Sequence, residues 1–420
     1  MDTYINRLID EKVEKYLKTF GAVSIVGPKW SGKTRTADHH AASAFYLTPT
    51  PEEPDPLALA KLDPSIVFKG ENPRLIDEWQ LMPEIWDMVR GDVDRRGERG
   101  LYLLTGSSVP PQIKPGNIIK HSGAGRIGKL TMSTMSLYET GDSSGEVSLA
   151  ALFNNEDVSG KLRHVGLSEI IHYIIRGGWP ANLGVEDASL IPKDYLDRIY
   201  DYEIRELGIK RMDLLKFQRF MYSLARNEGT VCSITTLRTD SSYNENKLDD
   251  DTVLHYLSII EDLYLTSNQQ AYSPNFRSRT RLKIGEKRHF TDPSLAAAIV
   301  GASEKSLMRD LKYLGFLFES LAEHDLRVYA ESMGGKLYHY QDYNEDEVDA
   351  VVVLDDGRFA LVEIKLGYED VADKAASSLM KVAEKLEEKP EFMAVVSGTA
   401  PIPFRRPDGV YVIPLTSLKP

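Results

Sequence analysis

Hydrophobic positions in the first third of the chain follow two alternating patterns. Helically spaced apolar residues predict helices at residues 1–20 and 34–44. Short, continuous apolar runs predict buried strands at residues 22–26, 73–78 and 101–108. Because strands that alternate with helices usually form a parallel sheet, this part of the chain predicts an α/β domain with flanking helices.

The middle of the chain has a mostly helical pattern. A Gly-Gly-Trp-Pro turn interrupts it at residues 176–180. Further helices are predicted at residues 214–227, 233–238 and 250–262, and residues 273–290 are compatible with an extended hairpin. Three short helices followed by a hairpin predict a winged-helix arrangement. Loop-like segments and the length of 420 residues then predict three domains, at residues 1–140, 160–292 and 293–420.

The first candidate site is a loop after the first predicted strand, which matches G-x-x-x-x-G-K-[ST] at every fixed position. Glycines at both ends permit the tight backbone that lets N–H groups cradle phosphate at a helix N-terminus. A lysine here would reach the β- and γ-phosphates of ATP, and the hydroxyl after it would bind Mg²⁺. The alternative is a glycine-rich turn between a strand and a helix. The residues predicted to hold the nucleotide are Gly27, Pro28, Lys29, Trp30, Ser31, Gly32, Lys33 and Thr34.

Two later strands end in polar residues that suit the same chemistry. Asp77 and Glu78 close the second strand and resemble a Walker B motif, in which Asp77 would hold Mg²⁺ and Glu78 would orient or deprotonate the attacking water. Thr105 closes the third strand, where a hydroxyl could sense the γ-phosphate; an ordinary strand end is the alternative. Arg126 is a further candidate, to neutralise charge in the transition state on its own ATP or on a neighbour's.

A second constellation lies near the C-terminal end. Residues 347–354 and 358–365 predict two strands joined by a turn with an Asp-Gly signal. If the loop has three residues, with Gly357 in the left-handed position, Asp349 lies opposite Glu363, and Lys365 shares their face. A loop of two residues would place the two carboxylates on opposite faces.

Two carboxylates and a lysine in this arrangement resemble the core of the PD-(D/E)xK nucleases, where they bind Mg²⁺ and stabilise a pentacovalent phosphate. A helix that carries an acid usually precedes this core, and Glu319 in the predicted helix at residues 313–323 would be that acid. The proline of the motif name is absent, because Val348 precedes Asp349. The alternative is a hairpin with an ordinary charged pair.

Charge and cysteine content narrow the functional classes. The net charge of −12 gives no overall electrostatic attraction to nucleic acid, and a single cysteine, Cys232, excludes an intrachain disulfide framework. The charged N-terminus and the lack of an apolar run near 18 residues predict a cytoplasmic protein without a membrane partner. The predicted hairpin is locally basic, so it would contact DNA phosphates, form a solvated surface or pack on an acidic partner. Its basic residues are Arg277, Arg279, Arg281, Lys283, Lys287 and Arg288.

Taken together, these motifs resemble the AAA-type ATPases of bacteria and archaea that carry a C-terminal domain of unknown function (the 4143 family). The resemblance extends over nearly the whole chain and includes the sequences at residues 27–34, 75–80, 104–108, 124–126, 176–180, 288–292, 347–349 and 363–365. It implies an α/β multidomain protein, with a P-loop parallel sheet, a winged-helix middle and a restriction-endonuclease-like C-terminal domain.

Two hypotheses from different classes follow. In the first, ATP hydrolysis is coupled to DNA handling by a Mg²⁺-dependent nuclease site. In the second, ATP gates an interaction module whose C-terminal domain binds protein or nucleic acid without cleavage. A small-molecule kinase leaves most of the chain unexplained, and the oligomeric state stays open.

Overall fold

The computed structural model describes residues 4–49, 55–106, 119, 121–156, 158–204, 214–242, 248–273 and 284–420. The chain forms two compact units, Met1–Thr134 with Asp262–Tyr264, and Met135–Glu261 with Leu265–Pro420. This division does not separate residues 160–292 from residues 293–420, so the three predicted domain limits stay predictions. In the described residues, no helix has both the length and the apolar character that crossing a membrane requires.

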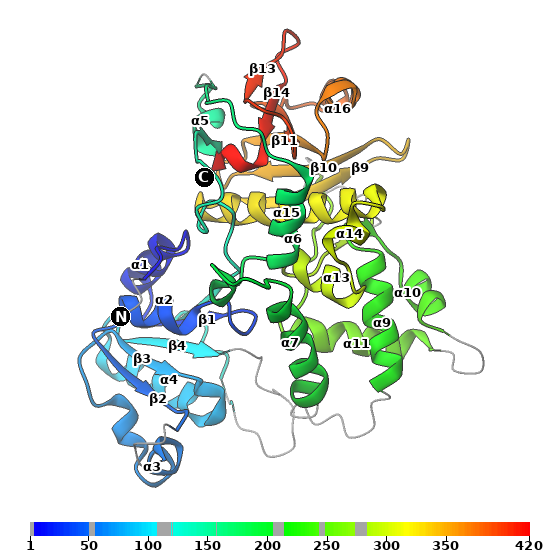
Figure 1. The fold of residues 1–420 in the computed structure, drawn as a ribbon. Helices are drawn as coiled ribbons and strands as arrows, with labels where there is room; N and C mark the ends of the chain where they lie inside the picture. The colour runs from blue at the N-terminus through cyan, green and yellow to red at the C-terminus, as the bar shows by residue number, and fades with distance from the viewer. Residues whose placement is uncertain are drawn as a thin grey trace. The chain divides into compact units, whose positions relative to one another are not determined.

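The first unit is built on a five-stranded parallel sheet with the strand order β2-β3-β4-β1-β5 (Figure 1). Its strands are β1 (Ala22–Val26), β2 (Ser43–Tyr46), β3 (Arg74–Asp77), β4 (Tyr102–Gly106) and β5 (Ile127–Thr131). Its helices are α1 (Asp10–Thr19), α2 (Lys33–His40), α3 (Pro56–Leu62) and α4 (Glu84–Arg96), with short turns η1 (Pro64–Phe68) and η2 (Trp79–Leu81). The predicted parallel sheet is confirmed.

Two predicted helices are too long. The sequence predicts a helix over residues 1–20, but α1 begins only at Asp10 and ends at Thr19. The sequence predicts a helix over residues 34–44, but α2 ends at His40, and Ala41 after it has an extended backbone. The following residues form β2, in which Ala44 pairs with Leu75 of β3. Pairing at the sheet edge therefore outweighs the helix propensity of the alanines, as tertiary context commonly does.

The second unit begins with helices. They are α5 (Leu149–Phe153), α6 (Leu167–Arg176), α7 (Leu190–Arg198), α9 (Leu214–Arg226), α10 (Ile234–Ser241), α11 (Asp250–Asp262), α13 (Pro293–Ile299) and α14 (Glu304–Leu307), with the short turns η3 (Pro180–Asn182) and η4 (Ile199–Glu203). The three helices predicted between residues 214 and 262 correspond to α9, α10 and α11. Strand β8 (Lys287–Arg288) pairs antiparallel with β7 (Thr230–Val231), and Lys287 also bridges to Gln269. The remaining hairpin residues, 274–283, lie outside the described part.

Two sequence patterns of this unit, at residues 176–180 and 288–292, meet in one buried turn. Gly177 has φ +66°, and the N–H of Gly178 donates a hydrogen bond of 2.9 Å to Oδ2 of Asp292. The indole N–H of Trp179, which is fully buried, donates to Oγ of Ser294 across 2.9 Å. A Cβ on Gly178 would lie 2.0 Å from the carbonyl oxygen of Met135, so only glycine fits there. This turn therefore holds the end of α6 against the start of α13.

The C-terminal part of the second unit is a six-stranded mixed sheet with the order β13-β14-β12-β11-β10-β9 (Figure 1). Its strands are β9 (Lys336–Gln341), β10 (Glu347–Val353), β11 (Phe359–Lys365), β12 (Met393–Ser397), β13 (Phe404–Arg405) and β14 (Tyr411–Pro414). Helices α15 (Leu311–Ser332) and α16 (Glu369–Lys385) pack on it. The last residues form η5 (Leu415–Ser417) and β15 (Leu418–Lys419), and β15 pairs with β6 (Val147–Ser148).

The hairpin of β10 and β11 has the register expected for a three-residue loop. Ala350 pairs with Val362, and the N–H of Leu354 donates to the carbonyl of Arg358 across 2.9 Å. Gly357 has φ +91°, the left-handed conformation that favours glycine. The predicted loop length and the left-handed position of Gly357 are therefore confirmed.

Candidate functional site

The loop that follows β1 has a backbone that requires its two glycines. Gly27 has φ +147°, and a Cβ on it would lie 2.2 Å from the carbonyl oxygen of Met132. Gly32 has φ +99° and precedes Lys33, the first residue of α2. The loop therefore leads directly into a helix N-terminus, which favours anions because its N–H groups and dipole point at them. The ammonium group of Lys33 curls back and donates to the carbonyl of Pro28 across 2.7 Å.

Three polar side chains lie close together beside this loop: one from the first turn of α2, one from the end of β3 and one from β4. The hydroxyl of Thr34 donates a hydrogen bond of 2.8 Å to Oδ1 of Asp77, and the hydroxyl of Thr105 donates to the same oxygen. Asp77 ends β3 and Thr105 lies in β4, where it pairs with Ile25 of β1. A hydroxyl and a carboxylate are the oxygen ligands that Mg²⁺ takes beside nucleotide phosphates. This set therefore fits a metal-bound nucleotide.

The backbone of Glu78 has the left-handed conformation, with φ +56°, which residues other than glycine rarely adopt. Its carboxylate accepts a hydrogen bond from the amide of Gln80, a residue that was given no role from the sequence. Burial raises the pKa of Glu78, and the charge of Asp77 adds to this effect. Burial lowers the pKa of Lys33 to about 8, although Glu78 and Asp77 oppose that shift. The acids and the lysine thus share one poorly hydrated space, where charges interact strongly.

A third contributor is Arg7, which the sequence patterns did not single out. It precedes α1 and is buried. Its guanidinium donates to the carbonyl of Ser31 in the loop at 2.8 Å and to the carbonyl of Ser133 at 2.9 Å. Arg7 therefore ties the loop to the chain that follows β5. A lone arginine ahead of a helix gives no sequence signal for such a contact.

The C-terminal constellation also assembles. The ammonium group of Lys365 lies 2.9 Å from Oδ2 of Asp349 and 2.7 Å from Oε2 of Glu363. The backbone N–H of Ile364 donates to the same Oδ2 across 2.8 Å. Burial, the charge of Asp349 and a hydrogen bond with it raise the pKa of Glu363 to about 9. The structure thus brings together the three hairpin residues that the sequence placed on one face.

Lys287 reaches the centre of this cluster from β8, a role that the sequence did not suggest. Its ammonium group lies 2.6 Å from Oε1 of Glu319, 3.2 Å from Oε1 of Glu323 and 3.8 Å from Oδ1 of Asp349. Burial alone would raise the pKa of Asp349, but Lys287 and Lys365 outweigh it and hold that pKa at about 2. Burial would lower the pKa of Lys287, yet the carboxylates raise it well above its usual value.

The cluster continues to a buried histidine. Nδ1 of His289 lies 3.2 Å from Oε1 of Glu228, and Nε2 lies 2.9 Å from Oε2 of Glu323. Ser320 donates a further hydrogen bond of 2.6 Å to Glu228. Burial would lower the pKa of His289, but Glu323 and Glu228 outweigh it and raise that pKa to about 9. A protonated His289 is therefore the second cation that compensates Glu323.

The predicted metal role of Asp349 and Glu363 stays a prediction. Within the described ranges, no group of three or more His, Cys, Asp or Glu side chains is placed to hold a metal ion. Glu319, Asp349 and Glu363 each face a lysine instead. The residues that a nuclease would need are present and adjacent, but their charges are compensated by ammonium groups.

Family models match both the part of the chain that carries the phosphate loop and the C-terminal part that carries the acidic cluster. Residues 19–141 match the family model of an AAA domain, and residues 314–418 match a domain of unknown function, DUF4143. The chain carries an AAA-type P-loop ATPase domain and a C-terminal DUF4143 domain. Residues 167–306 between them match a second domain of unknown function, DUF8612. The resemblance stated from the sequence motifs is confirmed.

Two mycobacterial proteins are similar to most of this chain. An uncharacterized protein of Mycobacterium bovis and one of Mycobacterium tuberculosis are each 24% identical over 364 residues, which cover 84% of this chain and 72% of each relative. Among solved structures, the Walker-type ATPase PABY2304 of Pyrococcus abyssi has 12% identity and a TM-score of 0.43, over 71% of this chain and 96% of that chain. The ORC2 protein of Aeropyrum pernix has 14% identity and a TM-score of 0.32, over 74% and 98%.

Arg126 is not brought to the phosphate loop of its own chain. It precedes Ile127, which pairs with Ala22 at the start of β1, whereas the loop follows the end of that strand. Its guanidinium instead donates to Asp94 of α4 across 2.7 Å. Because β1 and β5 are parallel, Arg126 lies at the opposite end of the strands from the phosphate loop. This position corrects the hypothesis that Arg126 acts on the ATP of its own chain.

The basic hairpin also needs a correction. Lys287 is buried in the acidic cluster and is not available to contact phosphates. Arg288 is mostly buried and lies 3.8 Å from Glu286. Three arginines and a lysine that complete the predicted basic surface lie outside the described residues: Arg277, Arg279, Arg281 and Lys283.

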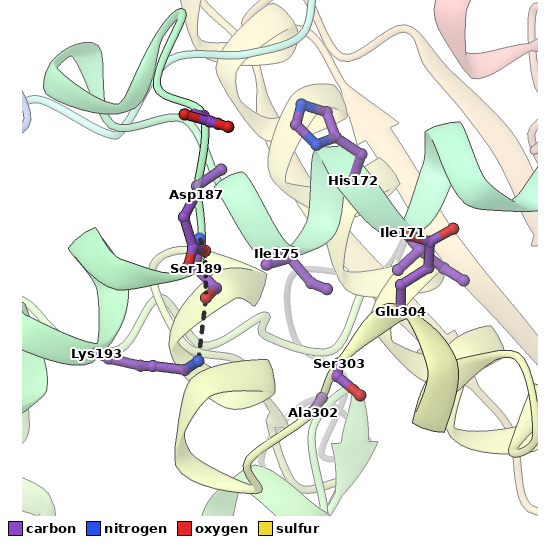
Figure 2. A pocket seen from close by; sticks show the side chains of 11 residues that line it. Ile171, His172, Ile175, Asp187, Ser189, Lys193, Ala302, Ser303 and Glu304 are labelled. Atoms are coloured by element: carbon purple, nitrogen blue, oxygen red, sulfur yellow. Dashed lines mark hydrogen bonds between the residues drawn. The ribbon is translucent and has the colours of Figure 1, made fainter.

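A separate cavity lies in the helical part of the second unit, between α6, the segment before α7 and the start of α14 (Figure 2). Lys193 lies 3.0 Å from the hydroxyl of Ser189, which donates to Asp187 across 2.7 Å. His172 and Glu304 also line it. Asp187, Ser189 and Lys193 form a hydrogen-bonded turn. None of the predicted site residues lines the cavity.

Proposed function

We propose that the AAA domain binds ATP with Mg²⁺ and hydrolyses it. The observation that carries this proposal is the convergence of Thr34 and Thr105 on Oδ1 of Asp77, beside the loop that carries Lys33. The ends of β3 and β4 and the first turn of α2 supply these groups at the carboxyl ends of a parallel sheet, which is where open α/β sheets bind ligands. The match to an AAA domain supports the same reaction.

Each residue has a defined task in this proposal. The N–H groups of residues 27–34 hold the phosphates, and the ammonium of Lys33 leaves the carbonyl of Pro28 to reach the β- and γ-phosphates. Glu78 orients the attacking water and accepts its proton. Thr105 lies where it can respond to the γ-phosphate through its bond to Asp77. Thr34 and Asp77 would hold Mg²⁺, which supplies charge stabilisation for the transferred phosphoryl group.

The experiment separates binding from turnover. Purified protein with Glu78→Gln should bind a fluorescent ATP analogue as tightly as the wild type but release phosphate about 10² to 10⁴ times more slowly, the usual scale for losing a general base. Lys33→Ala should lose both binding and turnover. Lys18→Ala is the matched control, because Lys18 is an exposed lysine of α1 that pairs only loosely with Glu14 at 3.7 Å. Wild-type turnover in both site variants would refute the assignment.

We further propose that the nucleotide state controls binding by the C-terminal domain, rather than cleavage. The two alternatives for this domain are a Mg²⁺-dependent nuclease and a binding module for protein or nucleic acid. The ion pairs of Lys287 with Glu319, Glu323 and Asp349 favour the binding module, because this lysine is not part of the nuclease-like motif and compensates carboxylates that a nuclease would offer to metal.

A cleavage assay decides between the two hypotheses. Labelled single- and double-stranded DNA are incubated with Mg²⁺, with and without ATP, beside a Glu363→Ala control. The binding module predicts intact DNA in every lane, and a binding signal that changes with nucleotide. Cleavage that disappears in Glu363→Ala would establish the nuclease instead.

A further inference from the structure

The acidic cluster consists of Glu319, Glu323, Asp349 and Glu363. The ammonium group of Lys287 lies among the first three of these side chains. We propose that the ammonium group of Lys287 is the resident cation of this cluster, and that it excludes a divalent metal ion from Glu319, Glu323 and Asp349. This inference concerns the second unit alone and does not depend on the ATPase proposal.

The hydrogen bonds of Lys287 are complete. An ammonium group has three donors and no acceptor. Lys287 donates to Oε1 of Glu319 at 2.6 Å, to Oε1 of Glu323 at 3.2 Å and to the backbone carbonyl of Asp349 at 3.4 Å. Three acceptors from two different elements, α15 and β10, therefore match the three donors. A lysine that merely rested near acids on a surface would not be enclosed in this way.

Each carboxylate of the cluster also faces a cation that the chain itself supplies. Asp349 faces both Lys287 and Lys365, and Glu363 faces Lys365. Glu323 faces both Lys287 and His289. A divalent ion would need these oxygens at about 2.0–2.6 Å, inside the space that the ammonium group now fills. It would also stand beside existing positive charges in a buried region, where repulsion is strong.

The backbone keeps Lys287 in this position. Its N–H donates to the carbonyl of Gln269 and its carbonyl accepts from the N–H of Gln269, both across 3.0 Å. On the other side of the strand it pairs with Val231 of β7. The side-chain amide of Gln269 donates to the carbonyl of Asp349 across 3.2 Å, the same oxygen that Lys287 uses. The pairing on both edges of β8 therefore fixes the Cα of Lys287 beside the cluster, within reach of its side chain.

This arrangement gives the cluster a structural task. It joins β8, α15 and the β10–β11 hairpin through buried charges whose partners are all supplied by the chain. Buried charges with matched partners are costly to disturb, because removing one partner leaves the other uncompensated. The nuclease-like residues are thus used to fix the DUF8612 and DUF4143 segments to each other within the second unit.

The test measures Mn²⁺ binding to the full chain, by the electron paramagnetic resonance of free Mn²⁺ and without nucleotide. Every protein carries Asp77→Asn, which removes the carboxylate of the AAA-domain site. The first comparison adds Asp349→Asn and should change Mn²⁺ binding less than twofold. A tenfold or greater loss with Asp349→Asn would show that the cluster already holds metal, and would overturn the proposal. This comparison leaves Lys287 intact, so it decides the question even if substitutions at Lys287 prevent folding.

The second comparison removes the ammonium group. Lys287→Met should create one site that binds Mn²⁺ at least tenfold more tightly, and adding Glu319→Gln should remove that gain. Lys287→Arg keeps a cation in place and should exclude Mn²⁺ as the parent does. Lys381→Met is the matched control, because Lys381 pairs with Asp346 at 2.7 Å on the exposed side of the same domain. A folded Lys287→Met protein that gains no site would refute exclusion by Lys287.

Discussion

Oγ1 of Thr34 lies 2.8 Å from Oδ1 of Asp77, although 43 positions separate the two residues along the chain. The contact exists because β1 and β3 run parallel on either side of β4, so that the loop after one strand meets the last residue of the other. A hydroxyl that donates to a carboxylate can turn its lone pairs to a metal ion once that ion binds between them.

Asp77→Asn should therefore lower Mg²⁺-dependent ATP turnover by about 10²-fold, the scale of losing one electrostatic stabiliser in an active site. Binding of ATP without Mg²⁺ should persist, because Lys33 and the loop N–H groups are unchanged. Steady-state phosphate release and equilibrium binding, measured with and without Mg²⁺, check the two parts. Asp63→Asn provides a control carboxylate that is exposed and belongs to neither the phosphate loop nor strands β3 and β4. Equal loss of binding under both conditions would mean that Asp77 supports the loop rather than the metal.

A backbone substitution tests the loop itself. Gly27→Ala should abolish ATP binding and lower the free energy of unfolding, because its Cβ would lie 2.2 Å from the carbonyl oxygen of Met132 at φ +147°. Gly91→Ala is the matched control: Gly91 lies inside α4 with nothing within 4 Å of its Cβ, so the change should stabilise the protein by about 0.5–1 kcal/mol. Denaturant unfolding and ATP binding measure both. A Gly27→Ala protein that binds ATP normally would contradict the loop geometry.

The sequence predicted well those features that depend on residues close together along the chain. The phosphate loop follows from spacing alone, and the Asp-Gly signal predicted the hairpin turn, although it left a two-residue and a three-residue loop open until the register and Gly357 were seen. It could not predict the role of Lys287, because a lysine between a glutamate and an arginine has the pattern of a solvated strand. Only the tertiary pairing of β8 with β7 and Gln269 turns that side chain inward. The predicted position of Arg126 was wrong because a basic residue near a strand does not indicate at which end of that strand the ligand site lies.

Lys287→Met should be among the most damaging single changes in the second unit. It removes the partner of Glu319 and Glu323 while keeping similar volume, and breaking a buried pair in this way costs about 3–5 kcal/mol. Adding Glu319→Gln should restore part of that loss, because one uncompensated carboxylate is removed. Lys381→Met should change stability by less than about 1 kcal/mol, because its ion pair is solvent-exposed. Denaturant midpoints of the four proteins give the comparison, and equal effects of the two lysine changes would contradict it.

The buried His289 makes stability depend on pH in a defined direction. Glu323 and Glu228 overcome the effect of burial and raise the pKa of His289 from 6.5 to about 9, so the folded state holds a proton that the unfolded state has released over this range. The stabilisation is therefore complete below pH 6.5 and is lost as the pH rises through 9, with a total on the order of 3 kcal/mol.

His289→Gln should remove this dependence. At pH 6 the wild type should be more stable than the variant, and the difference should shrink steadily between pH 6.5 and 9.5. The raised pKa values of Glu319 and Glu363, about 8 and about 9, make both proteins less stable over the same range, so the difference between them isolates the histidine. Urea unfolding at half-unit steps of pH measures it. A difference that stays constant across this range would show that His289 is neutral in the folded protein, and that Glu323 relies on Lys287 alone for its compensating charge.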